Sequence, residues 1–297
     1  MAISESQLET WSHQGAITMS KNTYASIKGN LEAKAASYAQ QNFEVFLQGS
    51  YGNDTNIRAD SDVDIVIMLT SIMRSDLGSL PSEQVEAYHR TFPKATYQFS
   101  DFRDGVIAQI RSVYGAQTTG AGKKAIKVTA SSNRLGADIV VCYQYRCYHY
   151  FYSQTNQLYD QGIIFPTSVG EEVINYPKLH SKNCTTKHQD TNSLLKPMIR
   201  IVKNMRSRMI ADGIIAEDVA PSYFIEGLFY NVPNNQYSGS LGDTFCNCVN
   251  WLLEADRSGF ICPNRKHSLF GNSSVHWDND KCFQFLSALV DFWNGSR

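Results

Sequence analysis

One short stretch, residues 43–69, constrains the fold of this chain more than any other. Two runs rich in β-forming residues, 43–47 and 63–69, enclose a segment that opens with Gly49. The second run begins beside Asp62 and Asp64, which alternate with aliphatic residues before the run becomes entirely apolar. Side chains two residues apart in a strand share a face, so both carboxylates point to the same side. The stretch therefore predicts a strand, a turn and a second strand that carries two negative charges at its start.

These residue types fit the chemistry of phosphates and divalent cations. A Gly49-Ser50 turn after a strand offers backbone N–H groups and a hydroxyl to an anion, because glycine allows close approach to the main chain. Two carboxylates on one face repel each other unless a cation lies between them, and Mg²⁺ prefers such oxygen ligands together with substrate phosphates. Asp138 supplies a third carboxylate on an apolar run that reads as a neighbouring strand. Three converging carboxylates would hold two Mg²⁺ ions, although Asp138 taken alone would more often be a hydrogen-bonded strand-end residue.

The chain divides into a mixed first half and a helical second half. The first 41 residues have apolar positions at helical spacing and predict one long helix or two in series. Further elements of the first half are helices at 82–92 and 101–114 and strands at 125–129, 136–145 and 147–152. Helices of the second half are expected at 190–212, 220–231, 241–257 and 278–294. The prediction is an α+β fold, a mixed β-sheet with helices plus a C-terminal helical lobe, with the boundary near 165–185 and the ligand site in the cleft between the two.

Composition excludes several classes of protein. The 297 residues include 27 Lys and Arg against 28 Asp and Glu, a formal net charge of -1, which argues against binding to long nucleic acid through many phosphate contacts. No apolar stretch approaches the roughly 20 residues that span a bilayer, and the first residues do not resemble a signal peptide, so we expect a cytoplasmic protein without membrane contact. The seven cysteines do not resemble a disulfide framework.

Gly-Ser, a spacer, Asp-x-Asp and a later Asp on a strand resemble the pattern of the nucleotidyltransferase superfamily with the polymerase β-like fold. The resemblance is closest to the cGAS/DncV-like nucleotidyltransferases, or CD-NTases, of bacterial anti-phage (CBASS) signalling, and it covers nearly the whole chain. It implies a catalytic core with a helical lead-in at residues 1–180 and a helical lobe like that of oligoadenylate synthetases at 181–297. It also implies that Asp62, Asp64 and Asp138 are both catalytic residues and ligands of two Mg²⁺ ions, for which Mn²⁺ can substitute.

A basic stripe on the helix predicted at 190–212 is the second point of resemblance. At about 100° per residue, Lys196, Arg200 and Lys203 share one side, and methionines of the core lie nearly opposite. Such a stripe is usually a solvated face. The resemblance implies instead that Lys203, and with less support Arg200, binds the donor triphosphate.

Ser222 and Tyr223 follow a proline near a predicted helix start, where a serine hydroxyl ordinarily caps the helix and a tyrosine ordinarily joins the core. In the resembling family a Ser-Tyr pair at this place gives the hydroxyl to the triphosphate and the ring to the donor base, where stacking contributes roughly 1–3 kcal/mol.

The remaining candidates concern base selection and the acceptor. Asn175 lies in a segment that resembles the family's base pocket, since an amide both donates and accepts, but an ordinary Asn before a turn explains it equally well. Gln48 and Thr55 are assigned to the acceptor side. A structural zinc on His180, Cys184, His188 and the pair Cys246 and Cys248 has little support, because no compact four-ligand set is evident.

The predicted function is that of a nucleotidyltransferase that joins two or three nucleoside triphosphates, such as ATP and UTP, into a cyclic nucleotide second messenger and releases pyrophosphate. The resemblance implies a product-sensing effector protein as partner. Two alternatives stay open: transfer of a nucleotide to another acceptor, such as an RNA end, a protein or a small molecule, and a module that binds nucleotides without catalysis. The sequence leaves base identity, ring size, linkage and oligomeric state undetermined.

Overall fold

A computed structural model of the chain describes residues 3–15, 17–57, 62–119, 125–166, 170–273 and 275–295. The chain forms two compact units. Unit 1 comprises residues 1–17, 49–60 and 180–297, and unit 2 comprises residues 18–48 and 61–179. Each unit therefore draws on segments that are far apart in the sequence.

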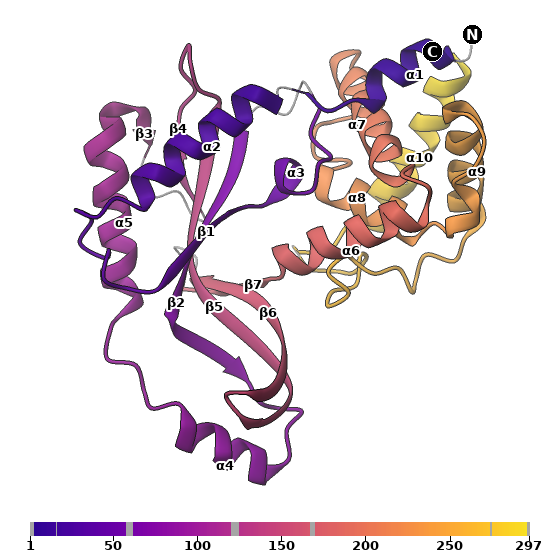
Figure 1. The fold of residues 1–297 in the computed structure, drawn as a ribbon. Coiled ribbons are helices and arrows are strands. Elements are labelled where there is room, and N and C mark those ends of the chain that lie inside the picture. Colours follow the sequence, from indigo (N-terminus) through magenta and orange to yellow (C-terminus); the bar gives the residue numbers. More distant parts are fainter. Residues whose placement is uncertain are drawn as a thin grey trace. The chain divides into compact units, whose positions relative to one another are not determined.

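Unit 2 is built on a mixed β-sheet (Figure 1). Among the described residues the strands follow the order β1-β2-β5-β4-β3, and β6 joins β5 to β7. Their bounds are β1 (Phe43–Leu47), β2 (Asp62–Asp76), β3 (Thr118–Thr119), β4 (Ile126–Val128), β5 (Gly136–Ser153), β6 (Asn156–Pro166) and β7 (Glu172–Asn175). The central strands β2 and β5 run parallel, whereas their neighbours pair antiparallel. A parallel pair requires a crossover connection, and helices α4 (Ser82–Thr91) and α5 (Phe99–Tyr114) provide it.

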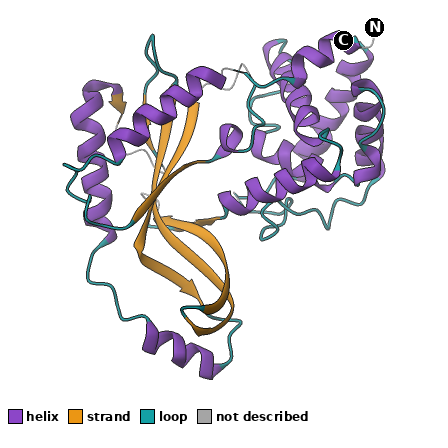
Figure 2. Ribbon diagram, in the orientation of Figure 1, coloured by secondary structure: helices purple, strands orange, loops and turns teal. Residues whose placement is uncertain are grey.

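The helices of unit 2 support the sheet at two places. Helix α5 contacts β2 and β5, and η1 (Gly115–Gln117) continues from it. Helix α2 (Ile17–Leu31) is held beside β1, where the hydroxyl of Tyr24 donates to the carbonyl of Val45. Helix α4 covers the far end of the ribbon formed by β5 and β6, where Tyr88 packs on Tyr148 and Phe151 (Figure 2).

Unit 1 is helical and has its own apolar core. Its elements are α1 (Glu5–Ser12), α3 (Gly49–Gly52), α6 (Pro177–Asp190, from His180 onward), α7 (Leu195–Ala211), α8 (Ser222–Asn231), η2 (Asn234–Gln236), α9 (Leu241–Glu254) and α10 (Asn279–Asn294). Met198, Val202, Met205 and Met209 on α7 are fully buried in this core, which confirms their predicted position.

Helix α1 belongs to unit 1 although it precedes the whole of unit 2 in the sequence. Leu8 is fully buried in the core that α7 to α10 form. The Glu5 carboxylate accepts hydrogen bonds from the backbone N–H groups of Leu241 and Gly242, where it satisfies orphan donors at the start of α9. Helix α1 and residues 49–57 thus belong to the same unit as the C-terminal helices, and the division of the chain into domains at residue 180 stays a prediction.

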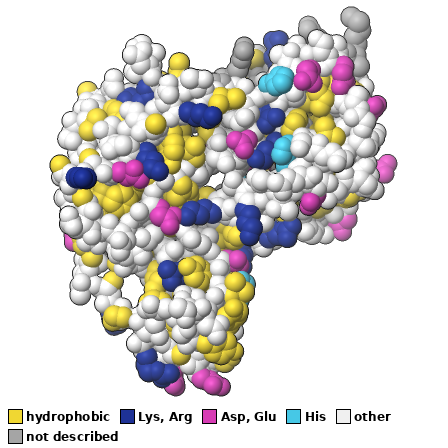
Figure 3. All heavy atoms as spheres, in the orientation of Figure 1, with side chains coloured by type: hydrophobic (Ala, Val, Ile, Leu, Met, Phe, Trp, Pro, Cys, Tyr) yellow, Lys and Arg dark blue, Asp and Glu magenta, His cyan; other side chains and the backbone are white. Residues whose placement is uncertain are grey.

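The predicted helices and strands mostly agree with the structure, and the lead-in is two helices in series. Helix α6 and strands β6 and β7 were not predicted. Within the described residues no helix is long and apolar enough to cross a bilayer. On the face shown in Figure 3, charged side chains of both signs are interspersed, in keeping with the near-neutral net charge.

Candidate functional site

A row of polar side chains crosses four adjacent segments of the unit 2 sheet. Asp64 on β2 lies opposite Asp138 on β5, and Asp138 lies opposite Lys127 on β4. On the other side of β2, the backbone N–H of Gln48 donates to the carbonyl of Asp64 at 3.0 Å and so continues the β1–β2 ladder. By strand alternation all four side chains belong to one face, which further along is covered by the apolar cluster around Val66. The predicted convergence of Asp64 and Asp138 is thus a consequence of parallel pairing.

Asp62 lies at the exposed start of β2, opposite Gly136. A Cβ at position 136 would lie 2.1 Å from the Oδ1 atom of Asp62, a distance that real Cβ atoms do not reach. Glycine at this position therefore leaves the space that the Asp62 carboxylate occupies, on the same face as Asp64 and Asp138. Gly136 lies two residues before Asp138, which is one full repeat of the strand, so the two positions share a face.

The Lys127 ammonium is the charged partner of Asp138. Its Nζ lies 3.1 Å from the Asp138 Oδ2 atom. This hydrogen bond is the main reason that the pKa of Lys127 is raised, and the negative charges of Asp138, Asp62 and Asp64 add to the effect against a small opposing contribution from burial. One positive side chain therefore senses all three carboxylates.

The three carboxylates fit a divalent cation in their chemistry. They offer only oxygen ligands, they share a face, and Gly136 leaves room for one of them. As the side chains stand, no group of three or more His, Cys, Asp or Glu side chains among the described residues lies close enough together to hold a metal ion. Asp138 is instead paired with Lys127.

The Gly-Ser turn begins the second segment of unit 1. Gly49 has a φ of +63°, a conformation that L side chains rarely adopt, and it opens the single turn of α3. Ser50 is half-buried in this turn. Gln48, the last residue of unit 2 before the turn, has a buried Oε1 atom that accepts no hydrogen bond from the described residues.

The basic stripe of α7 holds the segment that follows this turn. Lys196 donates to the Asp54 carboxylate at 2.9 Å, Arg200 donates to the backbone carbonyls of Asp54 and Ser12, and Lys203 donates to the carbonyl and hydroxyl of Thr55. Lys196 is 6% exposed and Lys203 is 0% exposed, so the stripe is not the open face that helical spacing indicated. Burial lowers the pKa of Arg200 to about 10, partly opposed by Asp54.

Glu226 on α8 is the centre of this buried network. Its carboxylate accepts hydrogen bonds from Lys203 Nζ at 2.8 Å, His180 Nε2 at 2.8 Å, Asn53 Nδ2 at 2.9 Å and the Thr55 hydroxyl. Burial alone would raise the pKa of Glu226, but the charge of Lys203 and the hydrogen bond from His180 outweigh it and lower the pKa well below its usual range. The carboxylate is therefore ionised at neutral pH.

This network changes the interpretation of two predicted site residues. Thr55 is 0% exposed and bonded to Glu226 and Lys203, which gives no support to an acceptor-side position, so its assignment to the acceptor stays a prediction. The Lys203 ammonium donates to the carbonyl and hydroxyl of Thr55 and to the Glu226 carboxylate, so in this structure it holds protein groups together. Its role as a triphosphate ligand, like that of Arg200, stays a prediction.

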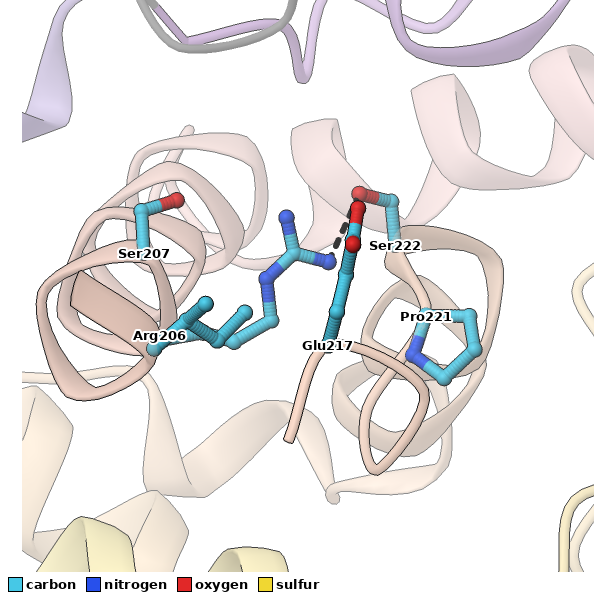
Figure 4. Close-up of a pocket in the computed structure, with 6 residues that line it drawn as sticks. Arg206, Ser207, Glu217, Pro221 and Ser222 are labelled. Atoms are coloured by element: carbon cyan, nitrogen blue, oxygen red, sulfur yellow. Dashed lines mark hydrogen bonds between the residues drawn. The ribbon is translucent and has the colours of Figure 1, made fainter. Parts of the chain in front are cut away.

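Ser222 and Arg206 lie together in a hollow of about 450 Å³ on the surface of unit 1 (Figure 4). Pro221, not Ser222, is the N-cap residue of α8, and no side chain caps the helix. The Ser222 hydroxyl instead accepts a hydrogen bond of 3.2 Å from Nη1 of Arg206, which also donates to the carbonyl of Ala220. Ser207 and Glu217 line the same hollow. The capping role of Ser222 is therefore excluded, and a guanidinium group accompanies its hydroxyl.

Tyr223 is partly buried at the edge of the unit 1 core. Its ring centroid lies 5.2 Å from that of His180, and its hydroxyl accepts a hydrogen bond from Asn264. Burial raises the pKa of Tyr223, so the phenol stays protonated. Base stacking on this ring stays a prediction.

Asn175 ends β7, and its side-chain oxygen accepts a hydrogen bond of 2.8 Å from the backbone N–H of Tyr176. This contact supports the alternative of an ordinary turn residue before α6, and base selection stays a prediction. Of the residues weighed for zinc, His180 is bonded to Glu226, and Cys184 is buried, which raises the pKa of its thiol.

Three site residues were not found by sequence reasoning. Glu226 lies three residues after Tyr223, but a lone Glu on an apolar helix carries no signal without its partners. Arg206 lies one turn after Lys203 on the same stripe, which could have identified it. Lys127 could have been found from the strand predicted at 125–129, because the only missing information was its register with Asp138.

Comparison with known proteins places these features in a family. Residues 182–294 match the family model described as the cGAS/DncV-like nucleotidyltransferase C-terminal helical domain. Over 295 residues, 99% of each chain, the sequence is 41% identical to a cyclic UMP-AMP synthase of Rhodothermus marinus. It is 35% identical to the cyclic nucleotide synthase CdnE01 of Staphylococcus haemolyticus, again over 99% of each chain.

Solved structures show the same relationship. The structure of the Rhodothermus marinus CdnE c-UMP-AMP synthase with Apcpp and Upnpp matches with a TM-score of 0.87 and 42% identity, covering 99% of this chain and 97% of that one. The CdnE cyclic dinucleotide synthase of Elizabethkingia meningoseptica with GTP and Apcpp matches with a TM-score of 0.74 and 30% identity, covering 99% and 98%.

Proposed function

Because this chain belongs to the cGAS/DncV-like nucleotidyltransferases, we propose that it joins nucleoside triphosphates into a cyclic dinucleotide with release of pyrophosphate. The observation that carries the proposal is the register of β2 and β5, which sets Asp64 directly opposite Asp138 with Asp62 on the same face. Three acidic side chains at the start of two parallel strands serve no packing purpose, since the core of this face begins only at Val66.

We assign the carboxylates to cation binding and to the acceptor hydroxyl. Asp62, Asp64 and Asp138 would hold Mg²⁺, which would supply charge for the reacting phosphate and the leaving pyrophosphate. Asp138, on the neighbouring strand, is assigned to the acceptor ribose hydroxyl, whose proton it would accept. Gly49 and Ser50 offer backbone N–H groups and a hydroxyl to the donor triphosphate.

The donor phosphates have a second set of ligands in the Ser222 hollow. Guanidinium groups bind phosphate oxygens through charge-assisted hydrogen bonds, and the guanidinium of Arg206 lies in hydrogen-bond contact with the Ser222 hydroxyl. We therefore add Arg206 to Ser222 as a phosphate-binding residue. Tyr223, next in the chain, would stack on the donor base.

Uracil and adenine are the bases we propose first, because the Rhodothermus relative is a cyclic UMP-AMP synthase and shares 41% of its residues with this chain. We further propose that the protein acts in the cytoplasm, that its product is a second messenger in anti-phage defence, and that an effector protein senses that product. These three points depend on the family resemblance.

The test is incubation of the purified protein with all four nucleoside triphosphates and Mg²⁺ or Mn²⁺, then phosphatase treatment and mass spectrometry. Phosphatase-resistant products that disappear in Asp62→Asn/Asp64→Asn are expected, with cyclic UMP-AMP as the main one. Asp104→Asn, on an exposed position of α5 in the same unit, is the matched control and should keep full activity. Linear products only, or turnover only with an added RNA or protein acceptor, would refute the cyclase. Nucleotide binding without pyrophosphate release would point to a non-catalytic module.

A further inference from the structure

Lys127 belongs to the row of polar side chains that crosses the unit 2 sheet, and the proposed reaction gives it no role. It lies on β4, in direct register with Asp138 on β5, and its Nζ is 3.1 Å from the Asp138 Oδ2 atom. The Lys127 side chain is 58% exposed and that of Asp138 is 24% exposed, so this ion pair lies at the surface of the sheet and is accessible to solutes.

The position of this lysine follows from the sheet itself. Antiparallel pairing of β4 with β5 places Lys127 across from Asp138, and parallel pairing of β5 with β2 places Asp64 on the opposite side of Asp138. Cross-strand neighbours on one face are close enough to interact. Asp138 therefore lies between another carboxylate and an ammonium group, and its own charge is shared between two possible cations: Lys127 and any metal ion that Asp64 also binds.

An ammonium group and a divalent cation compete for the same carboxylate oxygens. The Lys127 ammonium reduces the repulsion among the three carboxylates, which is the same electrostatic task that a metal ion performs. When both positive charges approach Asp138, they also repel each other. Binding of a metal to Asp138 is therefore coupled to loss of the Lys127–Asp138 ion pair.

We propose that Lys127 is a positioning residue that competes with a divalent cation for Asp138, so that this chain binds its metal more weakly than the carboxylates alone would. The proposal rests on the proposed function, because that function assigns the metal to Asp62, Asp64 and Asp138. It predicts that removing the Lys127 charge strengthens metal binding, whereas removal of a residue needed only for folding would weaken it.

The test is a titration of the nucleotide-free protein with Mn²⁺, followed by electron paramagnetic resonance of the free ion. Lys127→Met is expected to lower the Kd for Mn²⁺ by about two- to fivefold, the factor that an exposed ion pair contributes. Lys127→Arg keeps the charge and should stay close to the parent value. Lys28→Met, which removes an ammonium group of α2 that lies 3.7 Å from the Glu32 carboxylate, is the matched control and should not change the Kd.

A second variant makes the result specific. If the higher affinity of Lys127→Met for Mn²⁺ depends on Asp138, the double variant Lys127→Met/Asp138→Asn should lose that increase. It should bind Mn²⁺ more weakly than the parent protein. An unchanged or higher Kd in Lys127→Met, or no detectable binding in any variant, would overturn the proposal. Thermal unfolding of each variant shows whether it folds, and Lys127→Gln replaces Lys127→Met if it does not. Because no nucleotide is present, this outcome is independent of whether the chain makes a cyclic dinucleotide.

Discussion

Glu226→Gln provides the most direct test of the buried network in unit 1. The substitution keeps the shape of the side chain but removes the charge that faces the Lys203 ammonium at 2.8 Å. Lys203 is 0% exposed and Glu226 3% exposed, so water cannot replace the lost partner. Breaking a buried ion pair by removing one partner costs about 3–5 kcal/mol. We expect a loss of about this size in the free energy of unfolding of unit 1.

Removing the other partner, in Lys203→Met, should lower the free energy of unfolding by a smaller amount than Glu226→Gln does. In Lys203→Met the Glu226 carboxylate keeps its hydrogen bonds from His180, Asn53 and Thr55, so the charge that remains is still solvated by three donors. The double variant Glu226→Gln/Lys203→Met leaves neither charge unpaired. Its loss should fall below the sum of the two single losses by about 1–3 kcal/mol, as for residues in one hydrogen-bond network.

The four tryptophans allow the unfolding of unit 1 to be measured separately from that of unit 2. Trp11, Trp251, Trp277 and Trp293 all belong to unit 1, so tryptophan fluorescence during urea unfolding follows the unit that holds Glu226. Glu254→Gln, an exposed position on α9, is the control and should leave the transition in place. A loss under about 1 kcal/mol in Glu226→Gln, typical of an exposed pair, or full additivity in the double variant would refute the proposed role of the buried pair.

Three further predictions follow from the site. Gly136→Ala places a Cβ 2.1 Å from the Asp62 Oδ1 atom and so displaces that carboxylate. We expect kcat to fall about 100-fold, because a shift of about 1 Å in an active-site group has this effect. The control Gly29→Ala, whose added Cβ has nothing within 4 Å, should keep the parent kcat. Arg206→Ala should raise the KM for the donor triphosphate about tenfold, because a charge-assisted hydrogen bond is lost. Arg208→Ala, at an exposed position, is the control and should keep the parent KM. An equally unchanged KM in Arg206→Ala would exclude Arg206 from the phosphate site. Because the pKa of Glu226 is lowered in the folded state, its ionised carboxylate stabilises that state at every pH above the ordinary pKa of a Glu. This contribution should decrease as the pH falls below about 4.5. The tryptophan signal should show the decrease in the parent protein and not in Glu226→Gln.

The carboxylate half of the site was largely predictable from the sequence. Alternation along β2 determines which side Asp62 and Asp64 occupy, and an aspartate in an apolar strand, Asp138, calls for a functional partner. The pairing of β2 with β5 was not determined by local pattern, since register depends on contacts between residues more than 70 positions apart. This is why Lys127, whose role depends on the same register, was missed.

The helical half was predicted less well, for a different reason. Helical spacing correctly separated the methionines of α7 from its basic stripe, but spacing does not show what packs against a stripe. Residues 53–55 and Glu226 cover it, and they make Lys203 an internal charge. The same long-range packing places α1 with the C-terminal helices, against the simple order of the chain.

The interleaving of the two units also sets the order in which the nascent chain can fold. Every residue of unit 2 has been synthesised once position 179 is reached, so its sheet can close on the ribosome. Helix α1 is made before unit 2, yet Leu8 has no core to enter until α7 to α10 emerge. At about 5–20 residues per second, the remaining 118 residues take about 6–24 seconds, during which α1 and the segment of Thr55 have no partner. The carboxylate sheet can thus exist before the unit that carries the Gly-Ser turn, and that unit can form only when α7 to α10 have left the ribosome.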